Sequence, residues 1–427
     1  MNYEEALDYI HSVNWCFCKP GLERISTLCE ALGNPQKSLK FIHVAGTNGK
    51  GSFCAMLARI LKEAGYTTGL YTSPYIKTFN ERMSIDGESI SNDELIRLTE
   101  RIRPIADAME DKPTEFELIT ALAFDYFAEH NCDLVVLECG LGGRLDSTNV
   151  IDTSVLSVIT GVDLDHTAIL GNTIEEIAHE KAGIIKSGVP VVFGNNSHAH
   201  EALGVMRQVS TMKRAPLAVV DEALLSNIRY DLDKTTFDFD DMKDLELSLL
   251  GVYQPYNALN VLYAVRALRH QGYDIPEAAV RNGLRDVYWP ARFERLSDTP
   301  VVIYDGGHNP QGISAAKASI QAYFGDRKIL LLTGLMLDKD YSHMTRELIP
   351  MLDEVFTVTP NNPRSMEARE LAEIYKNGGV NATAFDEIED GVKTAIKIAK
   401  EKGMPLFILG SLYLYCDVYP IVEKYVQ

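Results

Sequence analysis

Hydrophobic residues in the first half of the chain form short apolar runs that alternate with stretches of helical spacing. The runs 39–45 and 133–138 have the length and composition of buried strands, and residues 52–64 repeat their apolar positions at helical spacing. Thr173 and Glu176 form a capping box that predicts the start of a further helix. Because strands alternate with helices, we expect a doubly wound, mostly parallel α/β sheet that binds ligands at the carboxyl ends of its strands.

The second half of the chain resumes this alternation after a less regular segment. From 196 to 250 the periodicity weakens, and residues 227–250 predict antiparallel strands appended to the sheet. A helix is expected over 254–272 because its apolar face is clear. Four strand-then-loop units follow, at 300–309, 328–336, 354–360 and 404–413.

The length of 427 residues is too great for one ordinary hydrophobic core. We therefore predict two domains, a P-loop domain over residues 1–296 and a smaller Rossmann-like α/β domain over residues 297–427. The segment WPARFERLSD lies at this boundary, and we expect a hinge near residues 290–297.

Composition and charge restrict the possible partners and compartment. No apolar run approaches the ~18 residues of a membrane span, and acidic residues stand where a signal peptide would carry lysines, so we expect a cytoplasmic protein. The seven cysteines are scattered without a CxxC pair, which favours reduced thiols. With 41 basic against 60 acidic residues the net charge is −19, which disfavours nucleic acid and anionic membranes as partners.

The segment GTNGKGS (46–52) stands between a predicted strand and a predicted helix, where a phosphate-binding loop belongs. Backbone N–H groups at the helix start hold phosphate oxygens, Lys50 supplies a point charge, and the hydroxyl of Thr47 or Ser52 can face a metal ion. The strict Walker spacing is not met, because Val44 stands five positions before Gly49. A glycine-rich turn that binds nothing is the alternative.

Three further positions carry candidate chemistry. Glu138 ends a predicted strand and precedes a glycine-rich loop, so it could be a ligand for a hard metal ion or simply an exposed acid. His166 lies at a strand end, although a lone histidine is more often a core or surface group. Lys181 lies on the following helix, where an isolated lysine is usually solvated.

Taken in order, the short motifs resemble the Mur ligase superfamily and, within it, the folate branch of folylpolyglutamate and dihydrofolate synthases. In the first domain they are GTNGKGS, TSP, FNERM, GLGGRLDSTN, LDHTAILG and HEKAGIIK. In the second domain they are YNALN, ARFE, DGGHNP and GSLY. The resemblance spans nearly the whole chain, with one small departure, Gly307, where the family usually has alanine.

The resemblance implies roles for individual residues in binding ATP and two magnesium ions. The ATP site would comprise Gly46, Thr47, Asn48, Gly49, Lys50, Gly51, Ser52, Asn257, Arg292 and Asp305. Magnesium would be bound by Ser73, Glu138 and His166, and Lys181 would be carbamylated by CO₂. The catalytic set would be Lys50, His166, Lys181 and His308.

The resemblance also places the two other substrates. Arg82 would bind a substrate carboxylate, and His308 and Ser411 would face the incoming L-glutamate. The pterin end of the folate would lie near Gly21, Leu22, Glu23, Arg24, Glu115, Phe116, Glu117, Leu118, Leu145, Asp146 and Ser147. The expected activity is an ATP-dependent ligation of glutamate to a folate through an acyl phosphate, by a monomeric enzyme.

Two other functions fit parts of the sequence. A P-loop switch would hydrolyse nucleotide without depending on an amino acid, but it leaves DGGHNP and GSLY unexplained. A Mur-type ligase for another carboxylate, such as a UDP-linked substrate, would carry a separate domain before the P-loop, and Gly46 leaves little room for one. Dihydropteroate, dihydrofolate and reduced folylglutamates all remain open as acceptors.

Overall fold

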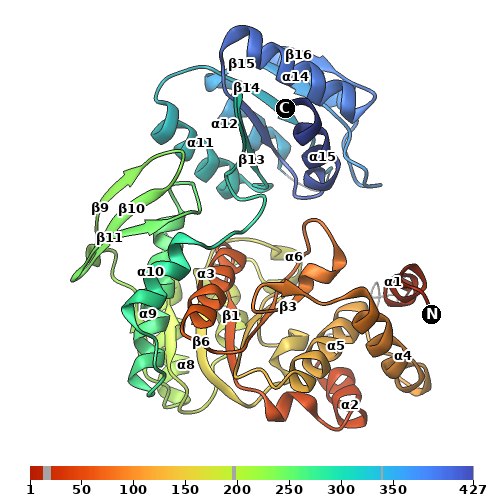
Figure 1. The fold of residues 1–427 in the computed structure, drawn as a ribbon, viewed down its shortest axis with the longest axis vertical. Coiled ribbons are helices and arrows are strands. Elements are labelled where there is room, and N and C mark those ends of the chain that lie inside the picture. The colour runs from red at the N-terminus through yellow and green to blue at the C-terminus, as the bar shows by residue number, and fades with distance from the viewer. Residues whose placement is uncertain (13–20, 195–198, 338–339, 427) are drawn as a thin grey trace. The chain divides into compact units, whose positions relative to one another are not determined.

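The computed structural model describes residues 1–12, 21–194, 199–337 and 340–426, which divide into two compact units (Figure 1). Unit 1 contains most of the chain up to Val287, and unit 2 contains the chain from Tyr288 onward. Two earlier segments, 227–237 and 246–255, also belong to unit 2. Unit 2 therefore contains segments from before and after residue 287, so cutting the chain at one position would not separate the two units.

Unit 1 is built on a mostly parallel sheet, which confirms the predicted fold class. Its strands are β1 (Phe41–Ala45), β2 (Thr68–Tyr71), β3 (Met83–Ile85), β4 (Glu88–Ser89), β5 (Leu134–Glu138), β6 (Ser154–Ile159), β7 (Val191–Phe193) and β8 (Leu217–Val219). They lie in the order β4-β3-β2-β5-β1-β6-β7-β8. Strands β2, β5, β1, β6, β7 and β8 are parallel, and the short β3 and β4 pair antiparallel at one edge.

The helices of unit 1 pack on this sheet or on one another, and together they bury its apolar side chains. They are α1 (Tyr3–Ser12), α2 (Glu23–Ala31), α3 (Lys50–Glu63), α4 (Asn92–Ala108), α5 (Glu115–Glu129), α6 (Thr167–Leu170), α7 (Ile174–Ala182), α8 (Ala199–Met212), α9 (Gln254–His270) and α10 (Glu277–Arg285). One core cluster joins α2, α4 and α5 to β1, β2 and β5, and another joins α7 and α8 to β6 and β7. The predicted capping box of Thr173 and Glu176 begins α7.

The segment of weak periodicity departs from the expectation. The strands β9 (Leu225–Tyr230), β10 (Thr235–Phe239) and β11 (Met242–Leu247) form a separate sheet in the order β11-β10-β9 and are not appended to the large sheet, whose edge is β8. Helix α8, which the weak periodicity did not predict, precedes them. A local pattern of polar and apolar residues indicates a strand, but it does not specify which strand will be its hydrogen-bonding partner.

Unit 2 contains a second, mostly parallel sheet. Its strands are β12 (Glu294–Asp298), β13 (Val301–Asp305), β14 (Ile329–Thr333), β15 (Leu352–Thr357), β16 (Asn381–Ala384) and β17 (Leu406–Leu409), in the order β12-β13-β17-β14-β15-β16. Its helices are α11 (Pro310–Phe324), α12 (Tyr341–Leu348), α13 (Ala368–Asn377), α14 (Ile388–Lys402) and α15 (Leu414–Val426). The four predicted strands correspond to β13, β14, β15 and β17. Strand β12 pairs antiparallel with β13 and overlaps the segment 290–297 that was predicted as the hinge.

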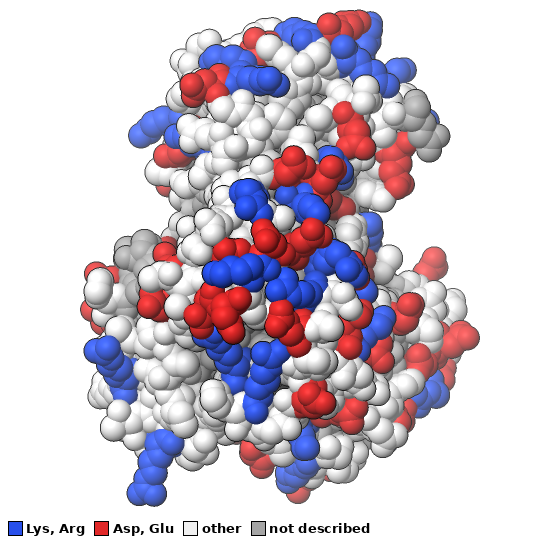
Figure 2. Space-filling model, turned by 60° about the vertical axis from the view of Figure 1, so that its left-hand side comes forward, with Lys and Arg blue, Asp and Glu red and all other residues white. Residues whose placement is uncertain are grey.

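One face of the molecule carries a mixture of charged side chains. Acidic and basic side chains are interspersed on the face drawn in Figure 2, without a broad basic area. Across the described residues, no helix is both long and apolar enough to cross a membrane. Five cysteines are free thiols (Cys29, Cys54, Cys132, Cys139 and Cys416), whereas Cys16 and Cys18 lie outside the described residues.

Candidate active site

The phosphate loop joins a buried strand to the start of a helix, as predicted. Strand β1 ends at Ala45 and helix α3 begins at Lys50. Gly49 has a φ of 82°, a conformation that glycine adopts without strain, and a Cβ there would lie 2.4 Å from Oδ1 of Asn257. Nζ of Lys50 donates hydrogen bonds to the carbonyls of Gly46 at 3.0 Å and Thr47 at 3.3 Å. The lysine and the helix N-terminus thus both lie at the loop, where an anion would bind.

The loop that follows β6 fastens the phosphate loop in place. Thr47 Oγ1 accepts the backbone N–H of Asp163 at 2.9 Å and donates to the carbonyl of Asp163 at 3.2 Å. Thr160 Oγ1 donates to the carbonyl of Asn48 at 2.7 Å. The hydroxyl of Thr47, expected to face a metal ion, is therefore engaged in joining two loops, and Ser52 on α3 is buried.

A second glycine-rich loop follows β5 and is held by Asp146. The buried carboxylate of Asp146 accepts the backbone N–H of Leu141 at 2.8 Å and that of Thr148 at 3.0 Å. Burial raises the pKa of Asp146, and these hydrogen bonds oppose the rise. The backbone N–H of Arg144 donates to the carbonyl of Glu180 at 2.7 Å, so the loop is also tied to helix α7.

These segments of unit 1 line a common cavity. Its polar groups come from the phosphate loop, from the glycine-rich loop, from the loop after β6 and from α7. The lining residues are Gly46, Thr47, Lys50, Cys139, Gly140, Leu141, Gly142, Asp165, His166, Leu170 and Lys181. The tertiary structure thus brings together Lys50, His166 and Lys181, three of the four predicted catalytic residues.

Lys181 lies in this cavity as a buried lysine, with 3% of its surface exposed. Burial, and then the nearby Lys50 cation, lower the pKa of Lys181 from 10.5 to about 7. Among the described residues, no hydrogen bond or ion pair to Nζ of Lys181 occurs. This lysine is therefore not the solvated helix residue that its position in the sequence alone would suggest.

The predicted magnesium ligands lie in two places on unit 1. Glu138 is buried at the end of β5, and its Oε2 accepts the backbone N–H of Ser73 at 3.3 Å. His166 has a φ of 49° and an exposed side chain 3.9 Å from a carboxylate oxygen of Asp165. No cluster of three or more His, Cys, Asp or Glu side chains able to hold a metal occurs in the described residues. Magnesium commonly uses one or two protein ligands together with water and substrate phosphates, so the residues present fit such a site.

The surroundings of Arg82 are those expected of a side chain that binds an anion. Its guanidinium lies 5.2 Å from the ring centre of Tyr75 and 5.7 Å from that of Phe79. Its Nε is buried and has no hydrogen-bond partner within the part of the chain that the structure describes. A buried donor without a partner is costly, which favours binding of a ligand carboxylate here.

The residues predicted to line the pterin end of the folate differ in their burial and in their contacts. Arg24 forms a 3.0 Å ion pair with Glu117, and both side chains are largely buried. Leu118 is fully buried in the core cluster of unit 1. Phe116 packs against Tyr71, with ring centres 6.0 Å apart, and lies over Gly140. Of the remaining members of this predicted set, Asp146 and Ser147 are buried, Glu23 is exposed, and Gly21, Leu22, Glu115 and Leu145 are partly exposed.

Three of the predicted segments, ARFE, DGGHNP and GSLY, lie close together in unit 2. A Cβ at Gly306 would lie 2.8 Å from Nη1 of Arg292 and 2.2 Å from the side chain of Leu412. His308 follows on the same loop, and its Nδ1 lies 2.9 Å from the carbonyl of Gly306. Ser411, the neighbour of Leu412, is buried, and its Oγ accepts the backbone N–H of Tyr413 at 3.1 Å.

Family models of Mur ligases match the two parts of the chain that contain these residues. The Mur ligase middle domain matches residues 44–265, and the glutamate ligase domain of Mur ligases matches residues 291–412. A dihydrofolate synthase/folylpolyglutamate synthase of Bacillus subtilis is 38% identical, over 97% of this chain and 98% of its own length. The chain belongs to the Mur ligase family, in its folylpolyglutamate and dihydrofolate synthase branch.

Solved structures of Mur ligases from this branch have the same fold. A Mycobacterium tuberculosis folylpolyglutamate synthase complexed with ADP and AMPPCP is 29% identical and has a TM-score of 0.88, with 99% of each chain covered. A second structure, an FPGS–AMPPCP–folate complex, is 35% identical and has a TM-score of 0.84, with 98% of each chain covered.

Some residues that shape the site of this Mur ligase were not found by sequence reasoning. Thr160 and Asp163 hold the phosphate loop, and His43 supports the glycine-rich loop. His43 Nε2 lies 2.8 Å from Thr148 Oγ1 and 3.1 Å from Cys139 Sγ, and burial lowers the pKa of His43 to about 3. Each of these residues contacts a partner that lies 96 to 116 positions away in the chain, so no local sequence motif indicates its role.

Proposed function

We propose that this chain is an ATP-dependent ligase that adds L-glutamate to a folate-type acceptor, with tetrahydrofolate, dihydropteroate or both as substrates. The observation that carries the proposal is the cavity where the phosphate loop, Lys50 and the buried Lys181 meet. Relatives that share this architecture over their whole length are named as folylpolyglutamate or dihydrofolate synthases, and one was solved with AMPPCP and folate.

In the proposed reaction the γ-phosphoryl group of ATP is transferred to the acceptor carboxylate, which gives an acyl phosphate and ADP. The glutamate amine then attacks the acyl carbon, an amide forms, and inorganic phosphate leaves. The first step requires alignment and charge neutralisation more than proton transfer. Lys50 and the N–H groups of the phosphate loop would stabilise the transferring phosphoryl group, and Arg292 and Asp305 would contact the nucleotide.

Arg82 would bind a carboxylate of the acceptor, because its guanidinium lies against the rings of Tyr75 and Phe79 and its buried Nε has no hydrogen-bond partner among the described residues. His308 would accept a proton from the glutamate amine. In the neutral imidazole, donation from Nδ1 to the carbonyl of Gly306 leaves the lone pair on Nε2, and this atom can act as the base.

Magnesium would be held by Ser73, Glu138 and His166 together with phosphate oxygens. Bound there, it would neutralise part of the charge on the phosphates. The buried carboxylate of Glu138 would supply a hard oxygen ligand of the kind that magnesium prefers.

We further propose that Lys181 is carbamylated. CO₂ reacts with a neutral amine, and a pKa of about 7 leaves a large neutral fraction at physiological pH. Carbamylation replaces a buried cation close to Lys50 with an anion, which removes the repulsion between the two lysines. The carbamate oxygens would also suit a magnesium ion beside the phosphates.

The proposed function is tested by phosphate release and by the mass of the product. With ATP, magnesium and glutamate, a folate acceptor should yield one phosphate per glutamyl group added, and comparison of dihydropteroate with tetrahydrofolate identifies the acceptor. Lys50→Ala should lower ligation by about 10²- to 10³-fold, because it removes a charge that stabilises the transition state. The matched control is Lys62→Ala, which removes an exposed lysine from the same helix. Steady hydrolysis without acceptor or glutamate would favour a switch instead.

A further inference from the structure

The turn that carries Arg292 has a strained backbone. Ala291 has a φ of 58° and Phe293 a φ of 47°, and both side chains are fully buried. A left-handed conformation is uncommon for residues other than glycine and is unfavourable for a bulky residue such as phenylalanine. Such a conformation persists only where surrounding contacts hold it, and it is frequent at functional sites.

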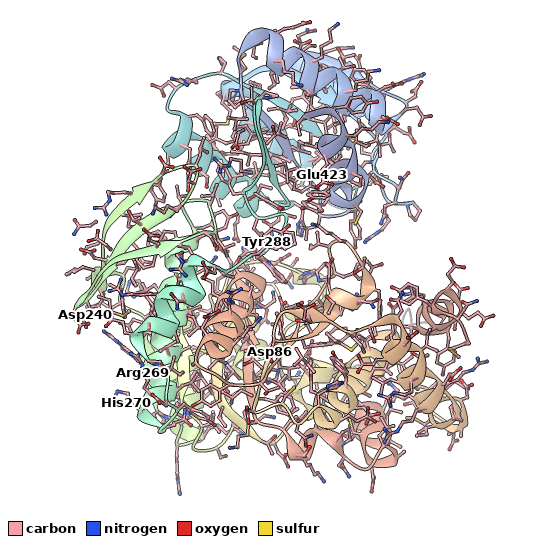
Figure 3. All side chains as sticks on the ribbon, viewed as in Figure 1. Asp86, Asp240, Arg269, His270, Tyr288 and Glu423 are labelled. Atoms are coloured by element: carbon pink, nitrogen blue, oxygen red, sulfur yellow. The ribbon has the colours of Figure 1, made fainter. Side chains whose placement is uncertain are left out.

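The buried carboxylate of Asp305 supplies several of those contacts. Its Oδ2 accepts the backbone N–H of Phe293 at 2.9 Å, and its Oδ1 accepts the backbone N–H of Gly307 at 2.7 Å. One side chain thereby fixes the strained turn on one side and the loop that contains His308 on the other. Glu294 assists, since its Oε2 accepts the N–H of Ala291 at 2.8 Å while its Oε1 accepts the hydroxyl of Tyr288, which is labelled in Figure 3.

Arg292 depends on this arrangement for its position. Its Nη1 donates to the carbonyl of Ala291 at 3.2 Å, and that carbonyl also accepts the N–H of Gly306 at 2.9 Å. The guanidinium is therefore packed over Gly306, where a Cβ would lie 2.8 Å from Nη1. A change in the turn would move the arginine relative to the Gly306 loop.

Tyr253 completes the binding of the Asp305 carboxylate from a distant part of the chain. It belongs to segment 246–255, one of the earlier segments included in unit 2. Its hydroxyl donates to Oδ2 of Asp305 at 2.7 Å, so that oxygen receives two donors. Burial raises the pKa of Asp305, whereas the Arg292 charge and the Tyr253 hydroxyl both lower it, so each helps to keep the carboxylate ionised.

We propose that Tyr253 is a positioning residue that acts through Asp305 to hold the turn Ala291–Phe293 and thereby to place Arg292 against the nucleotide. The inference rests on the proposed function, in which Arg292 contacts ATP. It assigns to Tyr253 an effect on nucleotide binding, although its hydroxyl is directed at a protein carboxylate.

The test is a double-mutant cycle on the full-length enzyme with Tyr253→Phe, Asp305→Asn and both substitutions. Tyr253→Phe should raise the KM for ATP by about tenfold, the change expected for one hydrogen bond to a charged acceptor. The KM for glutamate should stay within about twofold, because the hydrogen bond from Gly307 to Oδ1 of Asp305, which holds the His308 loop, does not involve Tyr253. The double variant should be no worse than Asp305→Asn, since Tyr253 acts only through that carboxylate.

Control variants distinguish a specific effect of Tyr253 on Arg292 from a general loss of folding. They also show whether a negative result contradicts the role of Tyr253 or the proposed nucleotide contact of Arg292. Tyr375→Phe removes another buried tyrosine hydroxyl of unit 2, which bonds to Thr333, and should leave the KM for ATP unchanged. Affinity for ADP, measured by calorimetry, gives the same comparison for any variant that has lost turnover. If Arg292→Ala raises the KM for ATP but Tyr253→Phe does not, or if the two effects in the cycle are additive, the inference is wrong. If Arg292→Ala itself leaves the KM for ATP unchanged, the nucleotide contact in the proposed function is wrong.

Discussion

Lys181 illustrates how burial changes the chemistry of a single residue. On a solvated helix its amine would be protonated at neutral pH, whereas burial and Lys50 lower its pKa from 10.5 to about 7. The neutral fraction is small below that value and rises above it, so carbamylation should become more complete as the pH rises through 7. With the proposed carbamylation, this residue would make the charge in the cavity depend on both pH and CO₂.

We therefore expect Lys181→Ala to lose most ligation activity and to recover part of it when acetate is added, because acetate can occupy the vacant anion position. In the wild-type enzyme, bicarbonate added after CO₂ has been removed should restore activity more fully at pH 8 than at pH 6. Lys186→Ala, which removes a half-buried lysine whose Nζ bonds to the carbonyl of Asn149, is the control and should show no acetate effect. Full activity of Lys181→Ala without acetate would rule out the carbamate.

At the scale of elements, the contact between the glycine-rich loop and helix α7 determines where Lys181 lies. A Cβ at Gly143 would lie 2.8 Å from the carbonyl oxygen of Glu180 and 3.1 Å from that of Lys181. Both atoms belong to the backbone, so neither can rotate away as a side chain would. The absence of a side chain at Gly143 allows the loop and the helix to meet.

Gly143→Ala should consequently destabilise the fold by about 1–3 kcal/mol, the usual cost of an overpacked contact. It should also lower the ligation rate, because the loop and α7 both line the cavity. Gly204→Ala is the matched control on α8, where a Cβ meets nothing within 4 Å. Thermal unfolding and the ligation assay measure the two effects, and an unchanged melting temperature for Gly143→Ala would contradict the role of this contact.

At the scale of the whole molecule, unit 2 is completed by chain that precedes its main segment. The backbone N–H of Gly251 donates to the hydroxyl of Tyr323 at 3.1 Å, and that of Val252 donates to Oγ of Ser319 at 3.1 Å. Tyr253 adds its hydrogen bond to Asp305. These three consecutive residues join an otherwise separate part of the chain to helix α11 and strand β13.

A fragment of residues 288–427 should therefore be much less stable than a fragment in which residues 246–255 are fused to it through a flexible linker. Three lost hydrogen bonds, at about 1 kcal/mol each, predict a difference of about 3 kcal/mol in the free energy of unfolding. Urea unfolding of the two fragments measures it. Equal stability would show that unit 2 does not need the earlier segment.

The amino-acid sequence by itself determined the α/β class, the strand–loop–helix unit around Lys50 and the family. Each of these depends on local information, such as the strand–loop–helix pattern around Lys50 or short motifs in a fixed order. The strands β13, β14, β15 and β17 were predicted for the same reason, since a short apolar run followed by a polar loop is recognisable without its neighbours.

Only the tertiary structure decided what depends on residues far apart in the chain. It showed that Thr47 bonds to Asp163, that Lys181 is buried beside Lys50, and that β9, β10 and β11 form a sheet of their own. It also placed Tyr253 against Asp305, 52 positions later in the chain. The physical reason is that burial, hydrogen-bond partners and pKa depend on the surroundings of a group in space, which the neighbouring letters of a sequence do not specify.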